Sequence, residues 1–208
     1  MAQVLIVANG GWPRTFNLEE NTEDFSTIIA LDGASNRLIE RGIIPQVIIG
    51  DLDSISTTVL KHCKKHGAKI VQETDQELSD VSKGLNYAHM NFPTSEIYII
   101  GIEIGRYDHH LAAYSALFEC QSSAIILLEE GWSARRVSST SRTIRVKPGS
   151  LVSLIPFGEV GGVYLKGCEF SLKDETLASG TRGVSNIAVE SSIMISAESG
   201  DLLLLIQG

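Results

Sequence analysis

Four aspartates stand at positions where their carboxylates could act together. Asp51 and Asp53 occur in the segment Gly-Asp-Leu-Asp-Ser, directly after the apolar run 47–49, and Asp32 follows the apolar run 28–31. Asp80 opens a helical pattern. In an open α/β sheet, ligands bind outside the carboxyl ends of the strands, so acids that follow strands meet at one edge. This arrangement predicts a bound divalent cation and, through it, a phosphate-bearing ligand.

The spacing of Asp51 and Asp53 strengthens this prediction. In an extended chain the two side chains would point the same way, about 6–7 Å apart. Carboxylates at ~6 Å repel each other by ~3 kcal/mol at an effective dielectric constant of 20. A hard cation such as Mg²⁺, which prefers oxygen ligands, would offset that repulsion. The alternative is that each aspartate only fixes a turn or caps a helix.

Two further groups could bring positive charge to the same edge. Asp80 and Lys83 are three residues apart, so on a helix they share a face, although a surface ion pair would have the same spacing. The segment 101–110 links a strand to a helix N-terminus, which is a natural anion site. Within it, Arg106 offers a forked donor for phosphate. One of the histidines at positions 109 and 110 could contact phosphate or substrate, but adjacent histidines on a helix diverge, so a shared metal is not expected.

Short apolar runs alternate with helical patterns through the first 130 residues. The runs are nearly pure Ile, Val and Leu, which is typical of parallel strands covered on both faces. We therefore predict a doubly wound α/β domain with a mostly parallel sheet over residues 1–132. Ser56 and Asp108 are the expected helix N-caps. Strands are expected over 4–8, 28–31, 47–49, 69–72, 97–100 and 124–128, and helices over 34–41, 56–66, 81–90 and 109–120.

After residue 132 the pattern changes to short β-type segments separated by glycines. The segment 183–186, Gly-Val-Ser-Asn, is typical of a turn when taken by itself. No pattern of helical length occurs in this part, so we predict a small all-β sandwich or barrel over residues 133–208. Its expected strands are 143–146, 151–155, 163–165, 187–189, 192–195 and 202–206.

Composition excludes several classes of protein. Residues 1–132 carry 9 basic and 18 acidic residues, against 8 and 7 in the remainder, so general nucleic-acid binding is not expected. The three cysteines are far apart and form neither a zinc pattern nor a disulfide framework. The N-terminus lacks a signal-peptide pattern, and no apolar window approaches the ~20 residues of a membrane span. We expect a reducing, cytoplasmic compartment and no membrane partner.

Several motifs, taken in order, resemble those of the thiamine pyrophosphokinase family over nearly the whole chain. Any one of them would be unspecific, but the ordered set is specific. At Ile104 and Ile187 the chain departs from the family pattern, in which a glycine and an acid are usual. The matching segments are Ala-Asn-Gly at 8–10, Asp-Gly-Ala-Ser-Asn-Arg-Leu at 32–38, Gly-Asp-Leu-Asp-Ser-Ile at 50–55, 76–83, Gly-Arg-Tyr-Asp-His-His-Leu at 105–111, Ser-Leu-Ile-Pro at 153–156 and Gly-Val-Ser-Asn at 183–186.

This resemblance implies an ATP-dependent enzyme that transfers the pyrophosphoryl group of ATP to the hydroxyl of thiamine, giving thiamine diphosphate and AMP. It implies a homodimer, with thiamine held between one subunit's α/β domain and its partner's β domain. The implied residues are Asp51, Asp53, Asp80 and Asp32 for Mg²⁺, with Asp32 also facing the substrate; Lys83 and Arg106 for the phosphates; Gln76, Ser79, Asp108 and His109 for the nucleotide; and Ser185 and Asn186 for thiamine.

Three other functions use similar features. A phosphatase of the haloacid-dehalogenase type also carries D-x-D after a strand, but usually near the chain start, where its first aspartate is the nucleophile. Here two apolar strands precede Asp51, and such an enzyme would give the β domain no role. The others are a pyrophosphokinase acting on a pterin alcohol and a non-catalytic module that binds a nucleotide or thiamine.

Overall fold

The computed structural model describes residues 2–103 and 105–208 and divides into two compact units. The α/β unit spans Met1–Glu129, and the β unit spans Glu130–Gly208. The sequence predicts a change of pattern after residue 132. A short 3₁₀ segment, η2 (Glu129–Gly131), lies at the division, and only strands follow it in the described residues. The predicted fold class, an α/β sheet followed by an all-β part, is confirmed.

The α/β unit is built on a parallel sheet with strand order β4-β3-β2-β1-β5-β6. Its central strands are completely buried, which explains their apolar composition. The order reverses between β1 and β5, and such a reversal opens a crevice at the carboxyl ends of the strands. The strands are β1 (Gln3–Val7), β2 (Thr27–Leu31), β3 (Val47–Gly50), β4 (Lys69–Gln72), β5 (Glu96–Ile100) and β6 (Ile125–Leu127).

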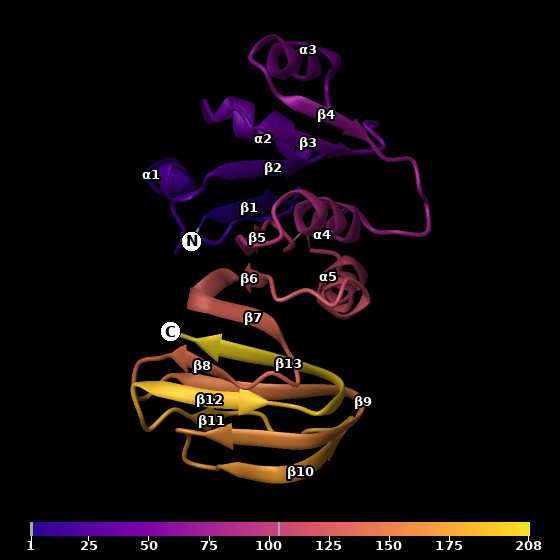
Figure 1. Ribbon diagram of the computed structural model, residues 1–208. Coiled ribbons are helices and arrows are strands. Elements are labelled where there is room, and N and C mark those ends of the chain that lie inside the picture. The colour runs from indigo at the N-terminus through magenta and orange to yellow at the C-terminus, as the bar shows by residue number, and fades with distance from the viewer. Residues whose placement is uncertain (1, 104) are drawn as a thin grey trace. The chain divides into compact units, whose positions relative to one another are not determined.

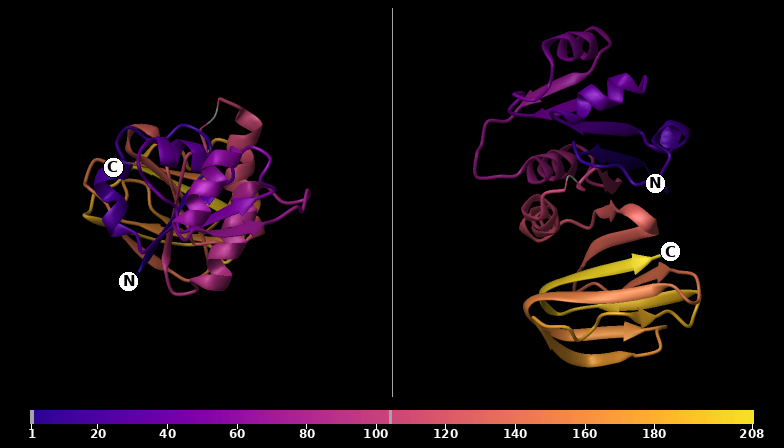
Figure 2. Two further views of the ribbon diagram at one scale, coloured as in Figure 1. Left: turned by 90° about the horizontal axis from the view of Figure 1, so that it is seen from above. Right: turned by 180° about the vertical axis from the view of Figure 1, so that it is seen from behind.

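Helices cover both faces of this sheet. On one face, Leu38 of α2 (Ala34–Glu40) and Cys63 of α3 (Thr57–Lys65) share a buried cluster with Leu5 of β1. On the other, Gly84 lets α4 (Asp80–Asn91) approach the sheet so closely that an added Cβ would lie 2.7 Å from Leu31. Figure 1 and the right-hand view of Figure 2 show α4 beside α5 (Tyr107–Glu119). The remaining helical segments are α1 (Leu18–Asn21) and η1 (Thr22–Asp24), and no helix in the described residues is long and apolar enough to cross a membrane.

Helix capping follows the sequence at α3 but not at α5. Ser56 is the N-cap of α3, as predicted, and its hydroxyl accepts from the backbone N–H of Val59. The prediction of Asp108 as the cap of α5 is wrong, because the helix begins at Tyr107 and Arg106 occupies the N-cap position without a side-chain bond. The Asp108 carboxylate pairs instead with the Arg106 guanidinium. Asp108 therefore forms an ion pair with Arg106 at the start of α5 and is not its N-cap.

The β unit consists of two antiparallel sheets that share one long strand. β9 runs through 16 residues; its first half pairs with β13 and β11, and its second half pairs with β10 and β12. The side chains between the sheets form one apolar core, as in a sandwich. The separate strands predicted over 151–155 and 163–165 are wrong, since both belong to β9. The strands are β7 (Trp132–Val137), β8 (Arg142–Arg145), β9 (Leu151–Lys166), β10 (Leu172–Ala178), β11 (Asn186–Ile187), β12 (Ser192–Ser196) and β13 (Ser199–Gln207).

Candidate active site

A cavity of about 550 Å³ opens at the carboxyl ends of the strands of the α/β unit. Gly101, directly after β5, has φ +84°, and an added Cβ would lie 2.2 Å from the carbonyl oxygen of Ala8 after β1. Only glycine allows these two chain ends to approach so closely where the strand order reverses. The lining residues are Ala8, Asn9, Leu31, Asp32, Gly33, Asp51, Ser54, Gln76, Leu78, Ser79, Asp80, Val81, Lys83, Gly101, Ile102, His109, Ala112 and Ala113.

The loop of residues 51–56, here called the acidic loop, brings three carboxylates together. Asp32, Asp51 and Asp53 each offer an oxygen, and these oxygens lie within 4.8 Å of one another. The extended geometry expected for Asp51 and Asp53 is wrong, because Leu52 has φ +69°. That turn brings the backbone N–H of Asp53 to 3.4 Å from a carboxylate oxygen of Asp51. The carboxylates are therefore gathered more tightly than an extended chain allows.

Asp32 is the buried member of this group. Its side chain accepts from the backbone N–H groups of Ser54 at 3.0 Å and Ile55 at 3.1 Å. Burial raises the pKa of its carboxyl above the ordinary value, and the negative charges of Asp51 and Asp53 add to that rise, while the two backbone hydrogen bonds oppose it. A cation at this point would favour the ionised form.

The donor set suits a hard divalent cation. All the convergent atoms are carboxylate oxygens, and Mg²⁺ binds through one or two carboxylates together with the phosphates of a substrate. Asp51 lines the cavity, whereas Asp53 is exposed and is not among its lining residues. Asp80 also lines the cavity, with half of its side chain exposed. The residues present therefore fit the metal that the sequence predicts.

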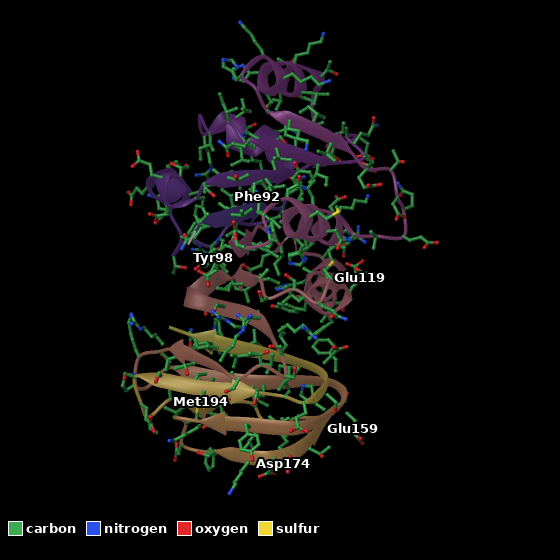
Figure 3. All side chains as sticks on the ribbon, viewed as in Figure 1. Phe92, Tyr98, Glu119, Glu159, Asp174 and Met194 are labelled. Atoms are coloured by element: carbon green, nitrogen blue, oxygen red, sulfur yellow. The ribbon has the colours of Figure 1, made fainter. Side chains whose placement is uncertain are left out.

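Lys83 lies inside the cavity wall rather than on the surface. Its side chain is only 4% exposed, and its ammonium is 3.6 Å from a carboxylate oxygen of Asp80. Ser79 starts the helix by accepting from the backbone N–H of Ser82 at 3.1 Å, which aims the first turn of α4 at the cavity. Glu119 of α5, labelled in Figure 3, accepts from the hydroxyl of Ser82 at 2.5 Å. The first turn of α4, which carries Asp80 and Lys83, is thus held by the Ser79 cap and by the contact with Glu119 of α5.

The remaining nucleotide-binding candidates divide into two groups. Gln76, Ser79 and His109 line the cavity. Arg106 and Asp108 do not; both are exposed, and they bind each other with contacts of 3.2 and 2.6 Å. The hydrogen bond from Arg106 lowers the pKa of Asp108 to about 2. The departure noted at position 104 lies outside the described residues.

The contact between Arg106 and Asp108 predicts how the Asp108 carboxyl titrates. In the Arg106→Gln variant, the pKa of Asp108 should rise from about 2 toward its ordinary value of 3.8. Since the folded pKa is depressed, the stabilisation by the pair is present above the unfolded pKa and is lost as the pH falls toward 2. NMR titration of the Asp108 carboxyl carbon measures this shift. The Arg14→Gln variant is the control, and an unchanged Asp108 pKa in Arg106→Gln would contradict the pairing.

The β unit contains a second cavity, of about 350 Å³. Asn186 lines it and is buried, and its amide brackets the backbone of Phe170: Oδ1 accepts from the Phe170 N–H at 3.0 Å, and Nδ2 donates to the Phe170 carbonyl at 2.7 Å. Phe170 also lines the cavity, yet it is 66% exposed. Ser185 is exposed, is not among the lining residues, and donates its backbone N–H to Ser153. The Ile187 departure is the partly exposed second residue of β11.

Two cavity residues, Asn9 of the α/β unit and Phe170 of the β unit, have no role predicted from the sequence. Asn9 follows β1 at the point where the strand order reverses, a position that marks ligand contact once the strand order is known. Phe170 is an exposed aromatic residue between two strands, and only its place beside Asn186 distinguishes it. Neither could be identified from residue type alone, because both depend on tertiary neighbours.

Two family models match the chain, one in each unit. Residues 18–128 match "Thiamin pyrophosphokinase, catalytic domain", and residues 141–202 match "Thiamin pyrophosphokinase, vitamin B1 binding domain". Each match lies inside one of the two compact units. The first covers more than half of the chain and contains the whole acidic loop together with Asp80 and Lys83.

Individual relatives agree with these models. Thiamine pyrophosphokinase 1 of Oryza sativa is 30% identical over 167 residues, covering 74% of this chain but only 63% of the rice protein. Thiamine pyrophosphokinase of Bacillus subtilis is 25% identical over 218 residues, covering 99% of this chain and 98% of that protein. The crystal structure of the Bacillus subtilis protein has a TM-score of 0.81 at 25% identity, covering 99% and 98%. The chain belongs to the thiamine pyrophosphokinase family, whose members are pyrophosphate-transferring enzymes.

Proposed function

We propose that this chain transfers the pyrophosphoryl group of ATP to the hydroxyl oxygen of thiamine, giving thiamine diphosphate and AMP. One observation carries the proposal: a chain with both family domains has Asp51, Asp80 and the buried Lys83 around a single cavity at the carboxyl ends of its strands. Acids beside one buried ammonium are suited to a polyphosphate that arrives with a metal ion. A cytoplasmic location remains an expectation from the sequence.

The metal would be Mg²⁺, held by Asp51, Asp53 and Asp80 and supported by Asp32. When bound, it neutralises phosphate charge and helps to hold the reacting phosphorus in position. Asp32 is anchored by backbone N–H groups, so its carboxylate has a fixed orientation. The four carboxylates are also the candidates for accepting the proton of the thiamine hydroxyl. Without a cation they repel one another, so a bound cation would offset that repulsion.

Polar and cationic residues around the cavity would hold the nucleotide. Lys83 is fixed by burial and by Asp80, so its ammonium is preorganised for a phosphate oxygen. Arg106 would exchange its contact with Asp108 for a phosphate, which its exposure permits. We assign the remaining contacts with the nucleotide to Gln76, Ser79, Asp108 and His109.

The reaction is an in-line displacement at the β-phosphorus. The thiamine oxygen forms a bond to that phosphorus, the bond from the phosphorus to the oxygen bridging to the α-phosphate breaks, and AMP leaves with the bridging oxygen. The hydroxyl proton leaves the nucleophile as the new bond forms. Such transfers depend on positioning and on neutralised charge, with little covalent chemistry by the protein. The residues of the cavity supply both.

We assign thiamine to the β unit, with Ser185 and Asn186 contributing through the turn that they form. The 350 Å³ cavity, lined mainly by apolar residues, and the exposed ring of Phe170 support this assignment. Thiamine is an aromatic cation, and aromatic faces attract cations. By its resemblance to the family, the active form is a homodimer in which one subunit's α/β unit and the partner's β unit share thiamine.

Removing the aromatic ring tests that assignment. The Phe170→Ala variant should raise the KM for thiamine about 10-fold, since an exposed cation–π contact and the lost apolar area together contribute ~1–2 kcal/mol. The KM for ATP should stay within about twofold of wild type. Initial rates over a thiamine series at saturating ATP measure this. The Tyr164→Ala variant removes an exposed aromatic ring of β9 that does not line this cavity, and it is the control. A normal KM for thiamine in Phe170→Ala would remove Phe170 from the thiamine site.

A product assay separates the proposed reaction from its rivals. The protein is incubated with ATP, Mg²⁺ and thiamine, and the nucleotides are separated by chromatography. The proposal requires AMP to form only when thiamine is present. Release of phosphate from ATP or phosphate esters, without AMP, would indicate a phosphatase. AMP formation with a pterin alcohol in place of thiamine would indicate the related pyrophosphokinase, and no turnover would indicate a binding module.

A further inference from the structure

Asn36 holds the backbone of the acidic loop at two points. Its Nδ2 donates to the carbonyl oxygen of Ser54 at 2.9 Å, and its Oδ1 accepts from the backbone N–H of Ser56 at 3.0 Å. Ser54 and Ser56 belong to neither a strand nor the body of a helix, so no regular ladder satisfies these groups. The amide side chain of Asn36 therefore satisfies one backbone carbonyl and one backbone N–H of the loop, as a neighbouring strand would in a sheet.

Asn36 and Asp32 hold adjacent parts of the loop in different ways. Asn36 lies in the first turn of α2, and Asp32 lies four residues before it, directly after β2; Asp32 binds the N–H groups of Ser54 and Ile55. Asp32 is a carboxylate beside Asp51 and Asp53, so its charge and contacts respond to a cation. Asn36 is neutral, so its hold on the loop does not change when the metal binds.

The position of Asn36 separates it from the ligands themselves. It is half-buried, and it is not among the lining residues of the cavity. Its backbone belongs to α2, which packs in the unit through the buried residues Ala34, Ser35 and Leu38. Its side chain can therefore influence chemistry at the cavity only through the acidic loop.

We propose that Asn36 is a positioning residue for the cation site, because it fixes the acidic loop so that Asp51 and Asp53 stay beside Asp32. Without it, the loop keeps the contacts of Asp32 but loses two hydrogen bonds, and the like charges of Asp51 and Asp53 would drive them apart. Outer contacts that orient metal ligands typically change metal affinity 10- to 100-fold. The inference rests on the proposed function only in taking Mg²⁺ as the cation.

The test compares metal binding with turnover in the Asn36→Ala variant. The dissociation constant for Mn²⁺, measured by electron paramagnetic resonance without nucleotide, should rise about 10-fold. The Mg²⁺ concentration that gives half-maximal AMP formation should rise by a similar factor, while turnover at saturating Mg²⁺ stays within about twofold of wild type. The backbone N–H of Ser56 should also exchange faster with deuterium.

Two further variants make the test decisive. Asn91→Ala removes a side-chain bond to the Tyr87 carbonyl at the far end of α4 and should leave Mn²⁺ binding unchanged. Asn36→Gln keeps the amide but displaces it by one methylene. Like Asn36→Ala, it should raise the dissociation constant for Mn²⁺. Normal Mn²⁺ binding in a folded Asn36 variant, or failure of both Asn36 variants to fold, would overturn the proposal. If the wild type binds Mn²⁺ but forms no AMP, the proposed function fails while this test stands.

Discussion

Replacing Asp51 with asparagine is expected to lower the turnover number about 10³-fold while the protein stays folded. Asp51 lines the cavity and contributes one of three convergent carboxylate oxygens. Asparagine has nearly the same shape but no charge, so it weakens the cation site without changing packing. A loss of this size corresponds to ~4 kcal/mol of transition-state stabilisation, which is typical for removing a preorganised charge interaction. Steady-state AMP formation at saturating ATP and thiamine measures it.

The same variant has a stability consequence that serves as its control. Removing one of three neighbouring negative charges relieves repulsion in the metal-free protein, so the melting temperature should be unchanged or higher without Mg²⁺. Added Mg²⁺ should raise the melting temperature of the wild type more than that of Asp51→Asn. The Asp75→Asn variant, which changes an exposed aspartate of the α/β unit that does not line the cavity, should keep normal turnover. Near-normal activity in Asp51→Asn would remove Asp51 from the metal site.

Replacing Lys83 with methionine should lower turnover about 10²- to 10³-fold without destabilising the protein. The Lys83 side chain is almost fully buried, and its ammonium lies 3.6 Å from a carboxylate oxygen of Asp80. A buried charge costs desolvation energy, and the half-exposed Asp80 stays hydrated without its partner, so a methionine of similar volume should raise the free energy of unfolding of the ligand-free protein by ~1 kcal/mol. Under the proposed function turnover should fall, because Lys83 lines the cavity and is the buried lysine or arginine among the described residues. Chemical denaturation and AMP formation measure the two effects.

Lower turnover together with a higher free energy of unfolding would distinguish a functional role of Lys83 from a structural one. If Lys83 had only a structural role, its loss would lower the free energy of unfolding and leave most of the activity. The Lys61→Met variant replaces an exposed lysine of α3; it should keep turnover within about twofold of wild type and change the free energy of unfolding by less than about 0.5 kcal/mol. A Lys83→Met protein that is less stable but nearly as active as wild type would contradict the assignment of Lys83 to phosphate.

The α/β unit was largely predictable because its central strands are buried on both faces. Continuous apolar runs such as Val47–Gly50 identify parallel strands, and β2 and β3 are each followed directly by an aspartate. Strand order does not follow from these runs. The reversal between β1 and β5, which brings Asn9 to the cavity, depends on packing between distant segments.

The β unit was predicted less well, for physical reasons. Pro156 and Gly158 are typical strand breakers, and the strand predicted over 151–155 ends just before them. In the structure β9 continues through both, and the positive φ of Gly158 (+90°) lies where the strand leaves one sheet for the other. β10 was missed because its residues are mostly polar and exposed. A strand at the rim of a sandwich has no strong apolar pattern to detect.

At the candidate site, sequence patterns identified charges but not their partners. The gathering of Asp32, Asp51 and Asp53 follows from strand ends and a short spacing. The contact between Arg106 and Asp108 could not be distinguished from a helix cap, because both need only a carboxylate near a helix start. The burial of Lys83 likewise depends on how α4 meets the sheet, which no local pattern encodes.

The fate of the terminal phosphate of ATP tests the central claim most directly. ATP labelled at the γ-phosphorus is incubated with the protein, Mg²⁺ and thiamine, and the label is followed through the separated products. Intact transfer of the pyrophosphoryl group predicts that all the transferred label lies in the terminal phosphate of thiamine diphosphate, with one unlabelled AMP formed per product. Label in thiamine monophosphate together with ADP, or in inorganic phosphate alone, would contradict the account.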